Sequence, residues 1–283
     1  MADWYEERFR DVLSVGLRLT GRVFEGRSPF QRVEIVDTAL WGRALVLDGI
    51  FQTAEREEFL YHEMLVHPAM TTAPSVRRVL VIGGGDGGTV REVLRHREVE
   101  QVVMIEIDPM VVEACQRHLT SIGTAWDDPR LDLRIADGVR YVQETDEPPF
   151  DVVILDGTDP VGPGEGLFDE AFYRGVARVL SPQGVFAAQT ESAILMPEVF
   201  SAIERVLGTV FTRVHPYFGC TPIYGAGHWT WTYATNGADP MAIDAARLGR
   251  IEDGCRYYNG EVHAAAFAQP QFIRQLLDPS AGR

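Results

Sequence analysis

Four acidic side chains stand where predicted strands end, the place where open α/β sheets bind their ligands. They are Asp86, Glu106, Asp137 and Asp156. Because ligands occupy the crevice beyond the carboxyl ends of such strands, we expect these carboxylates to face one crevice. A row of fixed negative charges attracts a cationic ligand and repels an anionic one.

Asp86 lies inside a glycine loop, Val79-Leu-Val-Ile-Gly-Gly-Gly-Asp-Gly-Gly88. The loop fits G-x-G-x-x-G from Gly83 to Gly88, and Glu106 follows at about the spacing of an acid that binds ribose hydroxyls. A pyrophosphate on the following helix would be repelled by Asp86, whereas an ammonium or sulfonium would be attracted. NAD is therefore disfavoured and an S-adenosyl cation favoured; the simpler alternative is a turn that needs glycine only for close packing.

Asp137-Gly138, after the third of these strands, has two interpretations. The carboxylate is placed to accept a hydrogen bond from an adenine amino group while the next backbone amide donates to the ring. An aspartate here is equally suited to cap the helix that follows. The sequence alone does not separate the two roles.

The fourth strand ends in Asp156-Gly-Thr-Asp159 at the head of a Pro/Gly loop. One aspartate in such a loop is usually explained by an Asx turn, but two at the same crevice suggest an amine site. An alkyl amine with a pKa near about 10.4 is mostly protonated and cannot attack until a base accepts its proton. One carboxylate serves as that base, and the second can hold a distant ammonium.

Strands and helices alternate from Arg77 onward. Strands are expected at 78–82, 101–105, 131–135, 150–155 and 184–189, and helices near 89–96, 109–119, 139–144, 169–180 and 197–207. This alternation predicts an α/β fold, with a parallel sheet wound by helices on both faces. Two late runs, 210–215 and 229–234, have no long helix between them and are expected to pair antiparallel at one edge of the sheet.

The N-terminal part of the chain has a different pattern. Short alternating runs at 30–35, 44–47 and 50–53, with the hairpin signal Asp48-Gly49, predict a small antiparallel β-domain. A helix is expected from 55 to about 70, ending near Pro68. We therefore divide the chain into an N-terminal β-domain with its linking helix, residues 1–70, and a catalytic domain, residues 71–283.

Charge and hydropathy exclude several classes of protein. The 283 residues include 26 Lys and Arg against 41 Asp and Glu, a net charge of −15 that argues against a nucleic-acid-binding surface. The acidity would help to attract a cationic substrate, although it can equally serve solubility alone. No apolar run approaches the roughly 18 residues that cross a bilayer, so no membrane association and a cytoplasmic location are expected.

Metal and disulfide sites are not expected. The cysteines, Cys115, Cys220 and Cys255, are far apart and lack the C-x-x-C spacing, so they suggest neither a disulfide framework nor a thiolate site. His62 and His67 resemble a zinc-protease pair, but they are five residues apart, which separates them by about 140° around a helix.

Beyond these single residues, several longer motifs resemble the polyamine aminopropyltransferases of the spermidine synthase family over nearly the whole chain. They are residues 47–64 (LDGIFQTAEREEFLYHEM), the loop 83–88 with Arg91-Glu92, and residues 103–108 (VMIEID), 127–130 (DDPR), 159–164 (DPVGPG), 256–259 (RYYN) and 266–270 (AFAQP). Jointly these motifs are highly specific.

The resemblance implies a Rossmann-like, methyltransferase-type catalytic domain and a homodimer or homotetramer. The donor would be decarboxylated S-adenosylmethionine as co-substrate, with no other cofactor and no metal, and the acceptor a diamine, putrescine first. By motif position, the donor would be held by Gln31, Asp86, Glu106, Asp137, Gly138 and Pro163. The amine would be held by Tyr61, His62, Asp86, Asp156, Asp159, Gln189 and Tyr224, with Trp4 at the far end of its channel.

In this interpretation Asp156 accepts the amine's proton, and the loop 160–166 closes over the ligands. Glu57, Gly157 and Ile223 depart from the family pattern, and the last two are expected to affect acceptor length or loop stiffness. Two other classes stay open: a methyltransferase that uses intact S-adenosylmethionine, and a polyamine or nucleoside sensor without turnover. The charge of Asp86 argues against the first, and the presence of a proton acceptor argues against the second.

Overall fold

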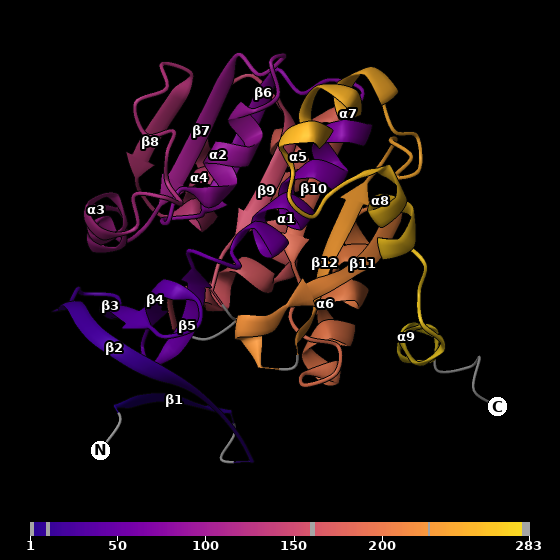
Figure 1. The fold of residues 1–283 in the computed structure, drawn as a ribbon. Helices are drawn as coiled ribbons and strands as arrows, with labels where there is room; N and C mark the ends of the chain where they lie inside the picture. The colour runs from indigo at the N-terminus through magenta and orange to yellow at the C-terminus, as the bar shows by residue number, and fades with distance from the viewer. Residues whose placement is uncertain (1–2, 10–11, 159–161, 226, 279–283) are drawn as a thin grey trace.

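A computed structural model describes residues 3–9, 12–158, 162–225 and 227–278, which form two sheets and their covering helices (Figure 1). The smaller sheet contains β1 (Trp4–Phe9), β2 (Leu13–Arg27), β3 (Arg32–Thr38), β4 (Gly42–Leu47) and β5 (Ile50–Ala54), antiparallel in chain order. Asp48 and Gly49 both have positive φ, 47° and 92°, as a two-residue hairpin turn requires.

The strands β1 and β2 were not predicted from the sequence. Most residues of β2 are exposed or half-buried, with only Leu19 buried. The alternating apolar residues Leu13, Val15, Leu17 and Leu19 are a strand signal that our prediction did not use. The runs predicted at 30–35, 44–47 and 50–53 correspond to β3, β4 and β5.

The larger sheet has the order β11-β12-β10-β9-β6-β7-β8. Its strands are β6 (Arg78–Gly83), β7 (Gln101–Glu106), β8 (Leu131–Ile135), β9 (Phe150–Asp156), β10 (Leu180–Gln189), β11 (Arg213–Thr221) and β12 (Gly227–Thr235). Strands β6 to β10 are parallel, and β12 pairs antiparallel with both β10 and β11, as the sequence predicted. The strand order reverses between β6 and β9, which is where such sheets open a crevice.

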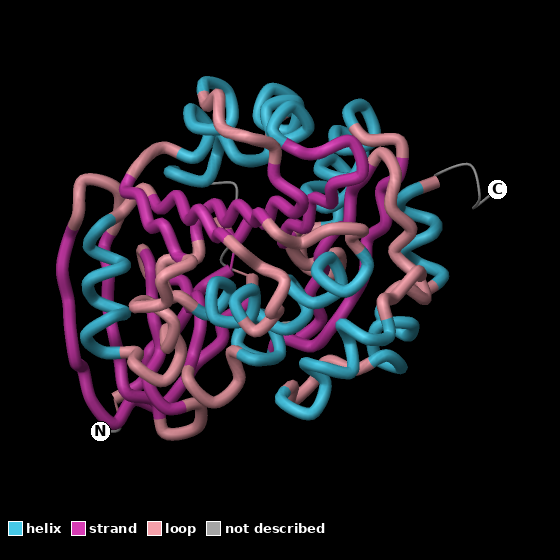
Figure 2. Tube along the Cα trace, turned by 90° about the horizontal axis from the view of Figure 1, so that it is seen from above, coloured by secondary structure: helices cyan, strands magenta, loops and turns pink. Residues whose placement is uncertain are grey.

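Helices cover both faces of this sheet, in agreement with the predicted doubly wound class (Figure 2). They are α1 (Phe59–Thr72), α2 (Gly88–Leu94), α3 (Pro109–His118), α4 (Gly138–Glu144), α5 (Glu170–Val179), α6 (Pro197–Val210), α7 (Ala245–Ile251), α8 (Gly260–Ala266) and α9 (Gln271–Leu277). One core lies under α1 and α2, and a second under α4, α5 and α6. None of these helices is both long and apolar enough to cross a membrane.

We predicted that the helix α1 ends near Pro68. In the structure it continues to Thr72. Proline lacks the N–H that would bond to the carbonyl four residues earlier. The hydroxyl of Tyr217 donates instead to that carbonyl, Met64 O, at 3.0 Å. A partner from β11 thus replaces the missing hydrogen bond, and nothing near Pro68 in the sequence indicates it.

Candidate active site

A cavity of about 120 Å³ lies beyond the carboxyl ends of β6, β7 and β9 and is closed on the other side by the N-terminal sheet. The four carboxylates that were expected to face one crevice all line it. The predicted site residues in its wall are Gln31, Tyr61, His62, Asp86, Glu106, Asp137, Gly138, Asp156 and Tyr224. Which ligand each of them holds stays a prediction.

The glycine loop after β6 wraps closely around Asp156. The N–H of Gly84 donates to Asp156 O at 2.9 Å. Gly83 has φ +81°, and a Cβ on it would lie 2.1 Å from the same carbonyl oxygen, so only glycine fits there. The loop that carries Asp86 therefore also fixes the backbone of Asp156.

Glu106 lies at the end of β7 and is almost fully buried. Burial is the main reason that its pKa is raised to about 7, although the N–H of Asp108 donates to the carboxyl at 2.9 Å and opposes the rise. Gln31 reaches this region from the N-terminal sheet, and its Nε2 donates to Asp108 Oδ2 at 3.0 Å. The contact is possible because β3 and β4 pack their apolar side chains on α3.

Asp137 caps α4. Its Oδ1 accepts hydrogen bonds from the N–H groups of Val139 and Arg140, at 2.8 and 3.2 Å. Both bonds go to Oδ1, so capping uses one of the two carboxylate oxygens. The structure thus shows the capping role, and the adenine role stays a prediction.

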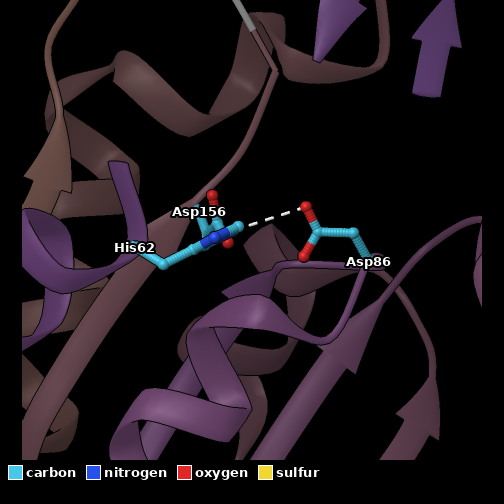
Figure 3. Close-up of side chains that lie close together, drawn as sticks. All are labelled: His62, Asp86 and Asp156. Carbon is cyan, nitrogen blue, oxygen red and sulfur yellow. Dashed lines mark ion pairs between the residues drawn. The ribbon is translucent and has the colours of Figure 1, made fainter. Parts of the chain in front are cut away.

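Asp86 belongs to a chain of alternating charges, which begins with its ion pair to His62 (Figure 3). His62 Nε2 lies 3.4 Å from Asp86 Oδ2, and His62 Nδ1 lies 2.6 Å from Glu58 Oε2, which Arg91 also contacts at 2.8 Å. Burial alone would lower the pKa of His62, but the two carboxylates outweigh it and raise the pKa well above the usual value. The two carboxylates thus favour the protonated form of His62, whose charge helps to hold the pKa of Asp86 below its usual value despite burial.

Asp156 is held by two hydroxyl groups. Tyr61 Oη donates to Oδ1 at 2.9 Å, and Thr89 Oγ1 donates to Oδ2 at 2.6 Å. Burial, followed by the negative charge of Asp86, raises the pKa of Asp156. The pKa values of the two neighbouring carboxylates therefore differ. Asp86 is the anion, and Asp156 is the better proton acceptor.

A second, larger cavity of about 520 Å³ adjoins the first, and Gln52, Tyr61, Gly157 and Tyr224 line both. Gln189 also lines this chamber, and its Nε2 donates to Gly157 O at 3.3 Å. Tyr224 donates to Gln52 O at 2.6 Å. The wall is mainly apolar and contains two further carboxylates, Glu7 and Glu191.

Some predicted residues cannot be placed in the site. Asp159, the start of the loop 160–166 and the side chain of Pro163 lie outside the part of the chain that the structure describes. Trp4 is on β1 with 54% of its surface exposed, and it is not among the described residues that line either cavity.

His62 and His67 do not share a site. His67 Nε2 contacts Glu92 at 3.0 Å and His67 Nδ1 contacts His96 at 3.2 Å, away from Asp86. Among the described residues, one atom each from His62, Asp86 and Asp156 lie within 4.8 Å of one another. Two carboxylates at this spacing also suit an ammonium group, and the ring of His62 occupies the third position of the cluster.

Three residues of the site were not identified from the sequence. Thr89 and Glu58 contact Asp156 and His62 respectively, but they are ordinary helix residues in the sequence pattern. Glu191 follows the buried end of β10 with φ 69°, which is unusual for a side chain other than glycine. In the sequence, only its position two residues after the predicted site residue Gln189 indicates that Glu191 belongs to the site.

Comparison with known proteins agrees with this geometry. Residues 58–242 match the family model described as the spermine/spermidine synthase domain, and residues 3–55 match the one described as the spermidine synthase tetramerisation domain. A polyamine aminopropyltransferase of Thermoanaerobacter sp. (strain X514) is 40% identical over 275 residues, which cover 97% of this chain and 98% of the relative. The chain belongs to the spermine/spermidine synthase family of polyamine aminopropyltransferases.

Other members of this family are similarly close. The polyamine aminopropyltransferase of Methanocaldococcus jannaschii is 40% identical over 278 residues, covering 97% of this chain and 94% of that protein. A crystal structure of spermidine synthase from Thermotoga maritima superposes with a TM-score of 0.92 at 38% identity, with 97% and 94% of the two chains covered. A spermidine synthase in complex with the transition state analogue AdoDATO gives a TM-score of 0.94 at 38% identity, with the same coverage.

Proposed function

We propose that this family member transfers the aminopropyl group of decarboxylated S-adenosylmethionine to a diamine, with putrescine as the first choice, giving spermidine and methylthioadenosine. The observation that carries the proposal is the pair formed by the buried Asp86 and the half-buried Asp156 beside an anion-repelling glycine loop. The AdoDATO complex of a 38% identical spermidine synthase supports it.

Donor selection depends on Asp86. The donor's ammonium gains a buried anion there, whereas the carboxylate of intact S-adenosylmethionine would face a like charge. Glu106 is placed to accept hydrogen bonds from the ribose hydroxyls, and Gln31, Asp137 and Gly138 line the same wall. The site thus selects for a cation at one end of the donor and a nucleoside at the other.

The reaction is a displacement at carbon. Asp156 takes a proton from the acceptor's ammonium, and the freed nitrogen lone pair attacks the methylene group next to the sulfonium. The carbon–sulfur bond breaks and its electron pair stays on sulfur, which leaves as the neutral thioether methylthioadenosine. Tyr61 and Asp156 hold the nitrogen in line with that bond, and such alignment supplies much of the acceleration.

The decisive assay measures methylthioadenosine release with putrescine and either the decarboxylated or the intact donor. Turnover with the decarboxylated donor is expected, with none from the intact donor. Turnover only with intact S-adenosylmethionine would establish a methyltransferase-type reaction instead. Tight binding of nucleoside and amine without any product would establish a sensor.

The acceptor and the assembly are parts of the same proposal. A panel of putrescine, cadaverine, agmatine and spermidine at equal concentration ranks the acceptors, and a higher kcat/KM for any other amine would replace putrescine. A homodimer or homotetramer is expected from the tetramerisation-domain match and from Trp4, Val12 and Leu13, which expose apolar surface on β1, on β2 and in the turn between them. Light scattering in solution determines which one forms.

A further inference from the structure

Both carboxylate oxygens of Asp156 accept a hydrogen bond from a hydroxyl group. Only one of the two hydroxyl-bearing residues lines the cavities. Tyr61 donates to Oδ1 from the cavity wall. Thr89 donates to Oδ2 from the opposite side, with its side chain completely buried in α2. We propose that Thr89 is a positioning residue for the aminopropyl transfer of the proposed function, because its hydroxyl orients the Asp156 carboxylate toward the acceptor amine.

The surroundings of Thr89 make this contact rigid. Thr89 follows the glycine loop in the first turn of α2, and that loop holds the Asp156 carbonyl through the Gly84 N–H at 2.9 Å. The same short segment, 83–89, therefore fixes both the backbone and the side chain of Asp156. Thr89 is completely buried, and close packing around a buried side chain limits its rotation to another partner.

Two donors on different oxygens prevent the carboxylate from rotating about its Cβ–Cγ bond. With one bond at 2.9 Å to Oδ1 and one at 2.6 Å to Oδ2, the plane of the group is set before an amine arrives. Each oxygen retains a further lone pair that can receive the ammonium proton. Preorganisation of a proton acceptor in this way lowers the reorganisation needed in the transition state.

The same hydrogen bond favours the ionised form of the base. Burial and the charge of Asp86 raise the pKa of Asp156, while the charge of His62 and the donors Thr89 and Tyr61 lower it. Without Thr89, more Asp156 would be protonated at a given pH and unable to accept a proton. Asp86 needs no such help, because His62 and the N–H of Gly88 already favour its anion.

The test compares Thr89→Val, which keeps the shape but removes the hydroxyl, with Thr89→Ser, which keeps the hydroxyl. The acid limb of the kcat pH profile is expected to move to higher pH by about one to two units in Thr89→Val. Thr89→Ser is expected to restore the profile, and donor KM stays unchanged in both. Thr72→Val is the control, because it removes a buried hydroxyl with an equally short bond, 2.7 Å to Pro68 O, far from Asp156.

A direct titration accompanies the kinetics. The carboxyl carbon of Asp156 is followed by NMR in ¹³C-labelled protein and assigned with Asp156→Asn, and its pKa is expected to rise in Thr89→Val only. A loss of kcat by the same factor at every pH, with no change in that titration, would overturn the proposal and leave Thr89 a packing residue. If the wild-type protein fails to turn over, the proposed function is wrong, while the titration still decides whether Thr89 controls Asp156.

Discussion

The two halves of the crevice are built differently. In the donor half, around the glycine loop, each carboxylate has a fixed partner: Asp86 has His62, Glu106 has the Asp108 N–H, and Asp156 has two hydroxyls. The half that we propose for the acceptor is a chamber of about 520 Å³ with a mainly apolar wall and the charged residues Glu7, Arg8 and Glu191. The donor cavity, by contrast, encloses about 120 Å³.

We infer from this difference that one half of the crevice determines the reaction and the other half determines which amine is accepted. Charges that are fixed in advance stabilise one distribution of charge in the reacting groups, so the donor half is suited to a single donor and one reaction. A roomy, mainly apolar chamber excludes few amines by shape. We therefore expect substitutions in the donor half to change rate and donor affinity, and substitutions in the chamber to change acceptor affinity alone.

The largest effect is expected from Asp156→Asn. Without a proton acceptor, kcat should fall by about 10² to 10⁴, because general-base catalysis contributes a factor of this size. Rapid-quench assays of methylthioadenosine release measure the rate, and calorimetry measures donor binding, which should stay unchanged. An equal loss in donor affinity would show that Asp156 acts as a donor-binding group and not as the proton acceptor.

A smaller effect is expected from pH on nucleoside binding. Since the pKa of Glu106 is raised to about 7, its ionised fraction grows from about one tenth at pH 6 to about nine tenths at pH 8. Ribose hydroxyls donate to the ionised form, so the affinity for methylthioadenosine should rise about tenfold over that range. Calorimetry at both values measures it. Glu106→Gln should bind weakly at both pH values, and an unchanged pH slope in that variant would assign the effect to another group.

Within the acceptor half, Glu191→Gln should raise the KM for the diamine about tenfold, since a hydrogen bond to a buried charged group contributes about 1.5 kcal/mol or more. Initial rates at saturating donor measure it, with donor KM as internal reference. Glu204→Gln is the matched control, because Glu204 is similarly buried but belongs to α6, where it accepts a hydrogen bond from Thr232. A change in donor KM in Glu191→Gln would remove the proposed division between the halves.

No effect is expected from removal of metal ions. The proposed displacement uses a sulfonium leaving group and a carboxylate base, so dialysis against EDTA should leave the rate unchanged. A loss of rate that Zn²⁺ or Mg²⁺ restores would indicate that an ion binds His62, Asp86 and Asp156, whose ligand atoms lie within 4.8 Å of one another.

The sequence predicted the parts of this molecule that depend on local pattern. The strands β6, β7 and β9 follow from apolar runs, and the position of Asp86, Glu106 and Asp156 follows from the rule that parallel strands end at one edge. The antiparallel pairing of β11 and β12 followed from the short connection between them. These features need no knowledge of distant contacts.

Features that depend on distant partners were missed. The continuation of α1 through Pro68 requires Tyr217, and the role of Thr89 requires Asp156, 67 positions further along the chain. The strand β2 was missed for another reason: Leu13, Val15, Leu17 and Leu19 alternate with polar residues and glycine, a local strand signal that our prediction did not use. Division of the chain at residue 70 stays a prediction, as does the cytoplasmic location.

The central claim is that the charge of Asp86 selects the donor. Calorimetry with decarboxylated and intact S-adenosylmethionine, on the wild type and on Asp86→Asn, tests it most directly. We predict that the wild type binds the decarboxylated donor more tightly, and that the ratio of the two affinities falls by about 10- to 100-fold in Asp86→Asn. If the ratio of the two donor affinities is the same in the wild type and in Asp86→Asn, the charge of Asp86 does not select the donor.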